Sequence, residues 1–357
     1  MSSKQNTPAL PSRFVTLDLM RGYFIVMIII NHLWRWPNAF IAISGANLLW
    51  FSGAEGFVIL SGFLIGYVRG YKGLKSKLKD VSKKLLHRSI MLYMWLIVTT
   101  ILLTVIFWNT TFLASAPWIP IEPGDYKSLI INTLTLGFAH NWVYFLYLYA
   151  VLIFLSPILV LLLRKNLTWL AAMLTAGLYA MGNLYSVEWM QWSPVFYLPM
   201  LFGFHLPTIA AWWHNLSYRK ALRNITITLT LVLLTISVLF IFAFSHIPEI
   251  SHINQYMSKD GGISVGRLAM AAVCFMGLYF LFNLAHKWID KYFGWLLRPF
   301  GNWSLAAYAL HGFVISGLSI FISQRGNIII NTVVTAAAII ITWSIVALKP
   351  LQRVLPK

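Results

Sequence analysis

Four ionisable residues of this sequence stand inside or beside apolar segments, where a charge is unfavourable. Asp18, Arg21 and His32 belong to the first apolar segment, and Glu55 belongs to the second. A charged side chain at the centre of a bilayer costs about 2.5–3.5 kcal/mol on insertion scales. These residues are therefore the first candidates for chemistry in the chain.

The spacing of the charged residues in the first segment determines which of them share a face of the helix. Arg21 and His32 are eleven residues apart, which is close to three helical turns. Both side chains therefore project from one face, with about 16 Å between them along the helix axis. Asp18 precedes Arg21 by one turn and can pair with it. Alternatively, these two residues simply neutralise each other near the helix end and reach the membrane interface.

His32 and Glu55 together suggest general-base catalysis. The second helix is expected to run back inward, so that the two residues lie within about 5 Å of the same depth in the outer half of the membrane. A carboxylate beside an imidazole fixes its tautomer and stabilises the imidazolium, as a general base requires. We therefore predict that His32 and Glu55 form a hydrogen bond or share one water. His311, in a later apolar segment, is a further candidate.

Two other interpretations of this cluster stay open. His32 alone is also typical of a packing histidine that bonds a backbone carbonyl. The four charged residues together would also serve a secondary transporter that couples a solute to protons. Such transporters often contain inverted repeats and helices broken at mid-membrane, and the sequence shows no internal repeat. Walker, dinucleotide-binding, nucleophile-elbow and zinc-type motifs do not occur in it either.

Membrane-spanning helices must position these residues. Of the 357 residues, 59% are hydrophobic and 10% are charged, whereas a typical soluble domain is about 25% charged. Apolar stretches of about 20 residues, the length that crosses the hydrocarbon core, recur from end to end. Only helices and closed barrels satisfy the backbone in lipid, and these stretches are too long for barrel strands. We predict an all-α, polytopic transmembrane helical bundle of about ten helices.

The bundle is expected to form a single membrane-embedded domain over residues 1–357, with a short cytoplasmic tail at 1–15. A short apolar stretch at 127–139 is expected to be interfacial or re-entrant. Glycines 62, 66 and 70, four residues apart, predict a ridge for close helix packing. The predicted spans are 16–35, 48–69, 89–108, 142–163, 167–186, 193–213, 224–244, 265–285, 301–323 and 326–348.

The basic residues predict how the chain is oriented. The net charge is +18, and most of the 27 lysines and arginines fall in loops on one side if the N-terminus is cytoplasmic, with the densest run at 69–88. Positive loops mark the cytoplasmic side and attract anionic lipid. Both termini are therefore expected inside, and nucleic acid is not an expected partner. Arg267 and Arg325, at outer helix ends, are expected as solvated loop charges, and binding of a substrate carboxylate is the alternative. The one cysteine, Cys274, is expected to pack in the apolar interior.

The first two spans resemble those of a known superfamily. Asp18-Leu-Met-Arg21-Gly22, followed by His32, resembles the first helix of the membrane acyltransferase superfamily, which includes the acyltransferase-3 proteins and the OpgC family. The segment 54–63, which contains Glu55 and Ser61, is similar to the OpgC form of the second helix. General acyltransferase-3 sequences usually share its Ser-Gly-Phe but lack the glutamate.

Later parts of the chain extend the resemblance. Arg88 followed by Leu92-Tyr93 resembles the start of the third helix of that superfamily. The segment 301–305, Gly-Asn-Trp-Ser-Leu, runs on to Tyr308 and His311 and resembles a late helix. The match is close over residues 14–95, weaker over 298–315 and loose between them.

The resemblance implies an integral membrane O-acyltransferase of the bacterial inner membrane. It would move a succinyl or acetyl group from cytoplasmic acyl-CoA to a hydroxyl of an envelope glycan on the outer side. OpgC proteins are associated with succinylation of osmoregulated periplasmic glucans. The implied partners are acyl-CoA, a carbohydrate acceptor and membrane lipids, and neither a metal nor a redox cofactor is expected.

The hypothesis gives each residue a role. His32 is the general base, Glu55 orients it, and Arg21 is structural or lines the donor path. The basic run at 69–84 meets the phosphates of CoA or only signals topology. A covalent acyl-histidine route is an alternative to direct transfer. The residues assigned to substrate or donor binding are Asp18, Ser61, Arg88 and His311.

Overall fold

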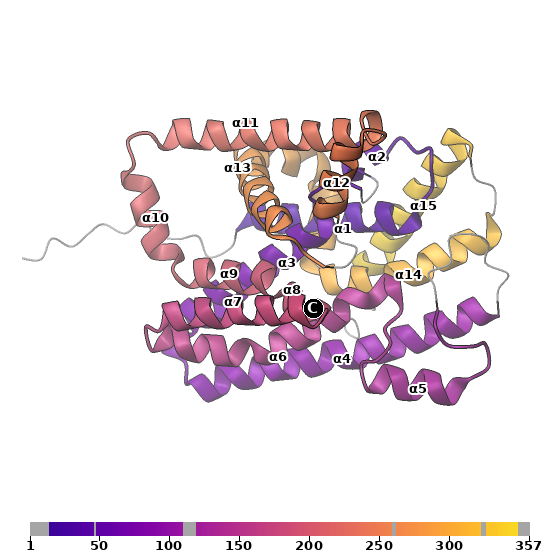
Figure 1. The fold of residues 1–357 in the computed structure, drawn as a ribbon, viewed down its shortest axis with the longest axis horizontal. Helices are drawn as coiled ribbons and strands as arrows, with labels where there is room; N and C mark the ends of the chain where they lie inside the picture. The colour runs from indigo at the N-terminus through magenta and orange to yellow at the C-terminus, as the bar shows by residue number, and fades with distance from the viewer. Residues whose placement is uncertain (1–13, 46–47, 110–118, 259–261, 323–325, 349–357) are drawn as a thin grey trace, which may run out of the picture. The chain divides into compact units, whose positions relative to one another are not determined.

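The computed structural model describes residues 14–45, 48–109, 119–258, 262–322 and 326–348, and these ranges contain helices and no strand (Figure 1). The all-α prediction is therefore confirmed. In chain order the elements are α1 (Val15–Leu33), α2 (Ile41–Ser44), α3 (Gly53–Leu64), η2 (Ile65–Tyr71), η3 (Lys72–Lys75), α4 (Leu78–Trp108), α5 (Tyr126–Leu134), η4 (Asn141–Val143), α6 (Tyr144–Arg164), α7 (Thr168–Leu184), α8 (Glu188–Gln191), α9 (Ser193–Phe204), α10 (Leu206–Asn215), α11 (Arg219–Val238), η5 (Leu239–Ala243), α12 (Pro248–Met257), α13 (Val265–Asn302), α14 (Ser304–Phe321) and α15 (Ile328–Ala347).

Seven described helices are long and apolar enough to cross a membrane, or eight if one bent pair is counted as a span. Within the described residues, each of the ten predicted spans is mostly helical. The span predicted at 48–69 divides into α3 and η2, and the span at 167–186 is α7 with 17 residues. A multi-pass helical membrane protein is therefore confirmed, while the count of ten is approximate.

Two helices are longer than the spans predicted for them. α4 has 31 residues and α13 has 38, and at 1.5 Å per residue α13 measures about 57 Å, well beyond the hydrocarbon core of about 30 Å. Lys287, Lys291 and Arg298 therefore lie on a helix and not in a loop as expected. Apolar periodicity ends where a helix leaves the membrane, but the helix itself does not have to end there.

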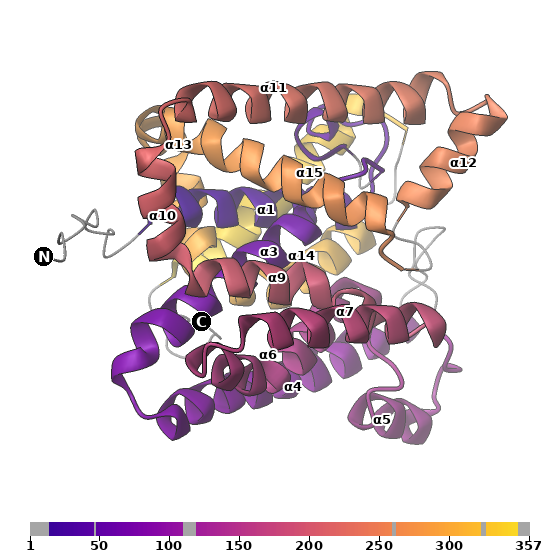
Figure 2. The same ribbon diagram turned by 60° about the vertical axis from the view of Figure 1, so that its left-hand side comes forward.

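The span predicted at 193–213 is broken. The stretch Glu188–Phe204 and α10 meet at 70°, and Figure 2 shows α10 turning away from α9. Pro207 stands at the start of α10, where it removes an N–H that a continuous helix would need. His205 lies between the two helices, and its Nε2 is 2.9 Å from the hydroxyl of Thr168.

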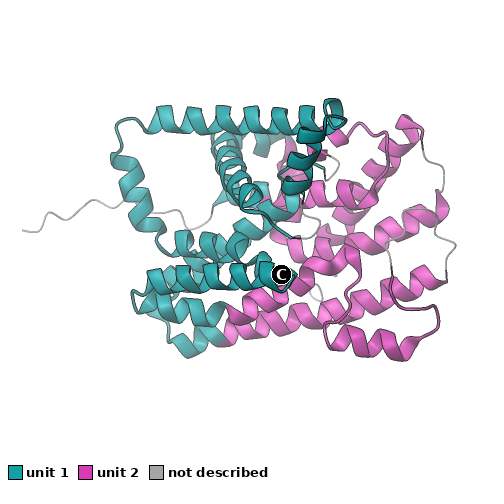
Figure 3. Cartoon of the chain, in the orientation of Figure 1, with its two compact units in different colours: residues 1–20, 48–82, 156–292 teal, residues 21–47, 83–155, 293–357 magenta. Residues whose placement is uncertain are grey.

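The chain divides into two compact units (Figure 3). Unit 1 comprises residues 1–20, 48–82 and 156–292, and unit 2 comprises residues 21–47, 83–155 and 293–357. His32 and His311 thus belong to unit 2, whereas Glu55 and Arg267 belong to unit 1. The prediction of a single domain over 1–357 is separate from this division and stays a prediction.

The predicted glycine ridge packs within unit 1. A Cβ at Gly62 or Gly66 would overlap the backbone carbonyl oxygen of Phe196 or Met200 on α9, and one at Gly70 would come within 2.9 Å of the Phe204 ring. The three positions and their three neighbours share the same four-residue spacing. The ridge therefore allows α3 and η2 to lie against α9, as small residues do in membrane helix pairs.

Replacing Gly66 with alanine should lower the thermal stability of the purified protein in detergent. The added methyl group must push α9 away, and overpacking of this kind costs about 1–3 kcal/mol. Gly177 on α7 is the matched control because nothing lies within 4 Å of a Cβ built there. Equal melting temperatures for Gly66→Ala and Gly177→Ala would contradict the close approach.

Candidate active site

A chain of hydrogen bonds joins two predicted site residues within unit 2. His32 lies in the last turn of α1, and its Nδ1 is 2.6 Å from Nε2 of His311 on α14. The two rings are tilted by 33°, with 4.9 Å between their centroids. His311 Nδ1 lies 2.5 Å from the backbone carbonyl oxygen of Tyr308. His311 is fully buried and His32 is half-buried.

These partners fix which nitrogens carry protons when both imidazoles are neutral. The Tyr308 carbonyl can only accept, so His311 Nδ1 must donate to it and His311 Nε2 must accept. His32 Nδ1 then donates to His311, and His32 Nε2 carries the lone pair. The arrangement therefore presents Nε2 of His32 as the basic nitrogen. This orienting role is the one that sequence analysis gave to Glu55.

A third histidine lies close to this pair. His140 directly precedes η4 and is fully buried, and its Nδ1 accepts a hydrogen bond from the backbone N–H of Trp142 at 3.4 Å. The backbone N–H of His140 donates to the hydroxyl of Thr100 at 3.4 Å. Burial, and to a lesser extent the electrostatic interaction with His311, lowers the pKa of His140 to about 4. His140 is therefore neutral at pH 7.

Arg21 is held against the end of α13 in unit 2. Its Nη1 donates to the carbonyl oxygen of Gly301 at 3.3 Å. The next residue, Gly22, permits this approach, because a Cβ there would overlap the carbonyl oxygen of Leu297. The motif Arg21-Gly22 thus joins α1 to the segment that leads into α14, which carries His311.

Glu55 occupies a helix cap in unit 1. The span predicted at 48–69 forms helix only from Gly53, so Glu55 lies in the first turn of α3 and not seven residues inside the helix as expected. Ser52 and Glu55 form a capping box, in which the backbone N–H of Ser52 donates to Glu55 Oε2 at 3.0 Å. The Ser52 hydroxyl also donates to Oε2. A carboxylate is favourable here because the helix N-terminus is positive.

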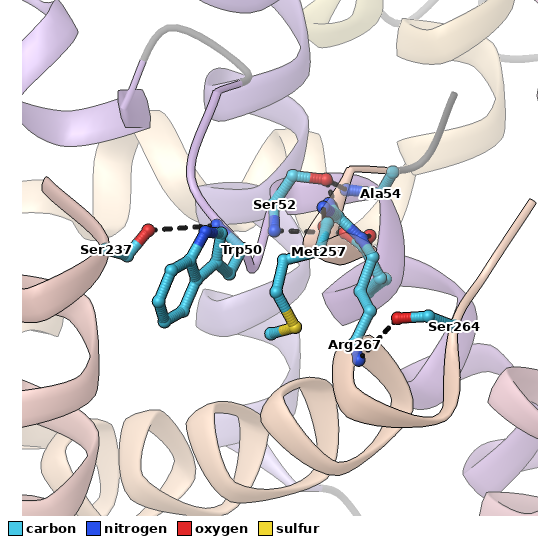
Figure 4. Close-up of polar contacts among 8 residues, drawn as sticks. Trp50, Ser52, Ala54, Ser237, Met257, Ser264 and Arg267 are labelled. Atoms are coloured by element: carbon cyan, nitrogen blue, oxygen red, sulfur yellow. Dashed lines mark hydrogen bonds and ion pairs between the residues drawn. The ribbon is translucent and has the colours of Figure 1, made fainter. Parts of the chain in front are cut away.

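Arg267 completes this cluster (Figure 4). Its Nε donates to Glu55 Oε1 at 2.6 Å, and its Nη1 donates to the Met257 carbonyl oxygen at 2.5 Å. Both side chains of the ion pair are buried, with exposures of 2% and 0%. The expectation that Arg267 is a solvated loop charge is therefore wrong. Arg325, the other arginine in that expectation, lies outside the described residues.

The remaining predicted site residues are distributed over three helices. Asp18 is half-buried on α1, Ser61 is buried on α3, and Arg88 is half-buried on α4. Asp18 and Ser61 belong to unit 1 and Arg88 to unit 2. The pairings of Asp18 with Arg21 and of Glu55 with His32 each join residues of different units, so both stay predictions. No cluster of metal-binding residues occurs in the described ranges.

Comparison with known families decides the classification. The family model described as OpgC protein matches residues 13–353, nearly the whole chain. The chain belongs to the OpgC family. Membership in the OpgC family indicates a membrane acyltransferase. A comparison with curated proteins found no match, and a comparison with solved structures found none either.

Among the contacts of this OpgC-family chain that its sequence did not predict are those of His140, Arg267 and Ser52. The one signal for His140 in the sequence is its position directly before the apolar span predicted at 142–163. The position of Arg267 near a helix end predicts a solvent-exposed side chain, whereas the side chain is buried. The Ser52-x-x-Glu55 pattern is a recognised capping signal that would have located the start of α3.

Proposed function

We propose that this OpgC-family protein is an O-acyltransferase that moves a succinyl or acetyl group from cytoplasmic acyl-CoA to a hydroxyl of an envelope glycan. The observation that carries the proposal is the hydrogen bond between His32 and His311. This bond orients the imidazole of His32 and leaves Nε2 as its basic nitrogen. His32 is also the histidine of the Arg21-to-His32 motif. Deprotonation of a sugar hydroxyl needs such a base near neutral pH.

The proposed reaction uses His32 twice. Its Nε2 accepts the proton of the acceptor hydroxyl as the oxygen attacks the thioester carbon, which gives a tetrahedral intermediate. Collapse of this intermediate re-forms the carbonyl, breaks the C–S bond and releases CoA, whose sulfur takes the proton back from His32. His32 stays bonded to His311 throughout. The negative end of the α1 dipole also stabilises the imidazolium, because His32 lies in the last turn.

Labelled acyl-CoA tests the proposed activity. Membranes that contain the protein are incubated with isotopically labelled succinyl-CoA or acetyl-CoA, and the glycan fraction is then analysed. We expect an ester-linked label that mild base removes, and membranes without the protein provide the control. The absence of label from every glycan and lipid fraction would contradict the proposal.

The transporter hypothesis has one observation in its favour. The break between α9 and α10 resembles the discontinuous helices of secondary transporters. Pro207 accounts for that break without a substrate site. The labelling experiment separates the two functions, because a transporter would move a solute without forming a covalent product.

The orientation proposed for the bacterial inner membrane has both termini and the basic run at 69–88 in the cytoplasm. Reporter fusions at Lys79 and at Asp260 should therefore report opposite sides of the membrane. Lys79 lies at the start of α4, and Asp260 lies outside the described residues. Reporters on the same side would mean that the number of crossings between the two positions is even.

A further inference from the structure

His140 has a buried donor that no described residue satisfies. Its Nδ1 accepts from the Trp142 N–H, so in the neutral ring the proton must be on Nε2. That Nε2 is buried and has no hydrogen-bond partner among the described residues. Buried donors are nearly always paired because an unmet donor is unfavourable. An unmet buried donor in a native structure needs an explanation, and a ligand to which it donates is one.

The surroundings of His140 place this donor beside the proposed base pair. Trp142 packs on α14 next to His311, because a Cβ at Gly312 would lie 3.6 Å from its indole ring. The backbone N–H of Phe145 donates to the Tyr308 hydroxyl at 3.1 Å, which joins the start of α6 to the same turn of α14. His140 is also close enough to His311 for the two rings to interact electrostatically. All of these residues belong to unit 2.

The geometry points to His140 as the oxyanion donor of the acyl transfer, with its Nε2–H bonding the acyl carbonyl oxygen as that oxygen becomes negative. This inference rests on the proposed function. When the acceptor oxygen bonds the thioester carbon, the carbonyl electron pair moves onto its oxygen. His140 donates a hydrogen bond to that oxygen and keeps its proton, while His32 holds the proton of the acceptor. Collapse returns the electron pair and releases the CoA thiolate.

The chemistry of His140 suits this role. A neutral imidazole donates without being a strong enough acid to protonate the intermediate. Three contacts hold His140 in place. Thr100 accepts from its backbone N–H, and the backbone N–H of Trp142 donates to its Nδ1. The Phe107 ring packs against the imidazole, with 5.1 Å between the ring centroids. A fixed donor stabilises the developing charge without rearranging during the reaction.

Replacing His140 with phenylalanine keeps an aromatic ring in the packing and removes the donor. We expect kcat to fall by about 10²–10³-fold, the effect typical of losing one oxyanion donor. KM for acyl-CoA and the pH midpoint of the rate, which reports the base, should stay unchanged. His140→Gln retains an amide donor and should recover part of the loss. Phe107→Leu, which changes the packing around His140 and keeps the donor, should lower kcat far less than His140→Phe does.

Three outcomes separate this inference from the proposed function. A wild-type protein without acyl transfer would overturn the proposed function. An active wild type together with a folded His140→Phe variant whose kcat is within threefold would overturn only the oxyanion role. An equal loss of kcat in Phe107→Leu and His140→Phe would overturn it as well, because packing would then explain both.

Discussion

His32→Ala should lower the rate of acyl transfer by about 10²–10⁴-fold, the usual contribution of a positioned general base. The variant should insert and fold normally, because His32 is half-buried and lies in the last turn of α1. The measurement is the initial rate of label transfer from acyl-CoA by purified protein, with folding checked by thermal unfolding in detergent. Residual transfer of tens of per cent in a folded variant would exclude His32 as the base.

The partner of His32 provides a matched pair of variants. In His311→Gln the side-chain carbonyl can still accept the hydrogen bond from His32 Nδ1, whereas in His311→Ala nothing replaces it. We expect the glutamine variant to be the more active of the two. Glu55→Gln tests the rival orienting residue and should impair catalysis less than His32→Ala. Equal rates for both His311 variants and the wild type would show that His311 does not orient the base.

Arg267→Met should destabilise unit 1 by about 3–5 kcal/mol, the cost of leaving one charge of a buried ion pair uncompensated. The affected charge is that of Glu55, which also accepts hydrogen bonds from the backbone N–H and the hydroxyl of Ser52. In the double variant Arg267→Met with Glu55→Gln no unpaired charge remains, so a large part of the stability should return. The measurement is thermal unfolding in detergent for the wild type, both single variants and the double variant.

A control defines the scale of this double-mutant cycle. Lys220→Met removes an exposed positive charge from α11 and should change stability by less than about 0.5 kcal/mol. Additive effects of the two single substitutions would mean that Glu55 and Arg267 do not interact energetically. The pair would then be a contact without consequence for stability.

The helical bundle could be predicted from the sequence because the membrane imposes it. Length, hydropathy and backbone hydrogen bonding leave few alternatives for a chain of this composition. The packing of the ridge at Gly62, Gly66 and Gly70 was predictable for the same reason, since small residues at four-residue spacing make one helix face flat. The full length of α13 and the break at Pro207 were not predicted, because the mean hydropathy of a sequence window marks neither the end of a helix nor a bend in it.

The partners within the site were less predictable than its members. His32 and His311 are 279 positions apart, so their hydrogen bond depends on tertiary packing that no local pattern encodes. Depth in the membrane suggested Glu55 as the partner of His32, but several residues share any one depth. The unexpected partner of Glu55 is Arg267, which lies in the first turn of α13, where a lone positive charge is unfavourable.

Transfer by the purified protein across a sealed membrane tests the central claim most directly. Proteoliposomes would carry labelled acyl-CoA on one side and a glucan acceptor on the other, with wild-type protein, His32→Ala or no protein. The account predicts ester-linked label on the glucan only with the wild type. Label on the glucan at the same rate with His32→Ala, or none with a folded wild-type protein in either orientation, would contradict it.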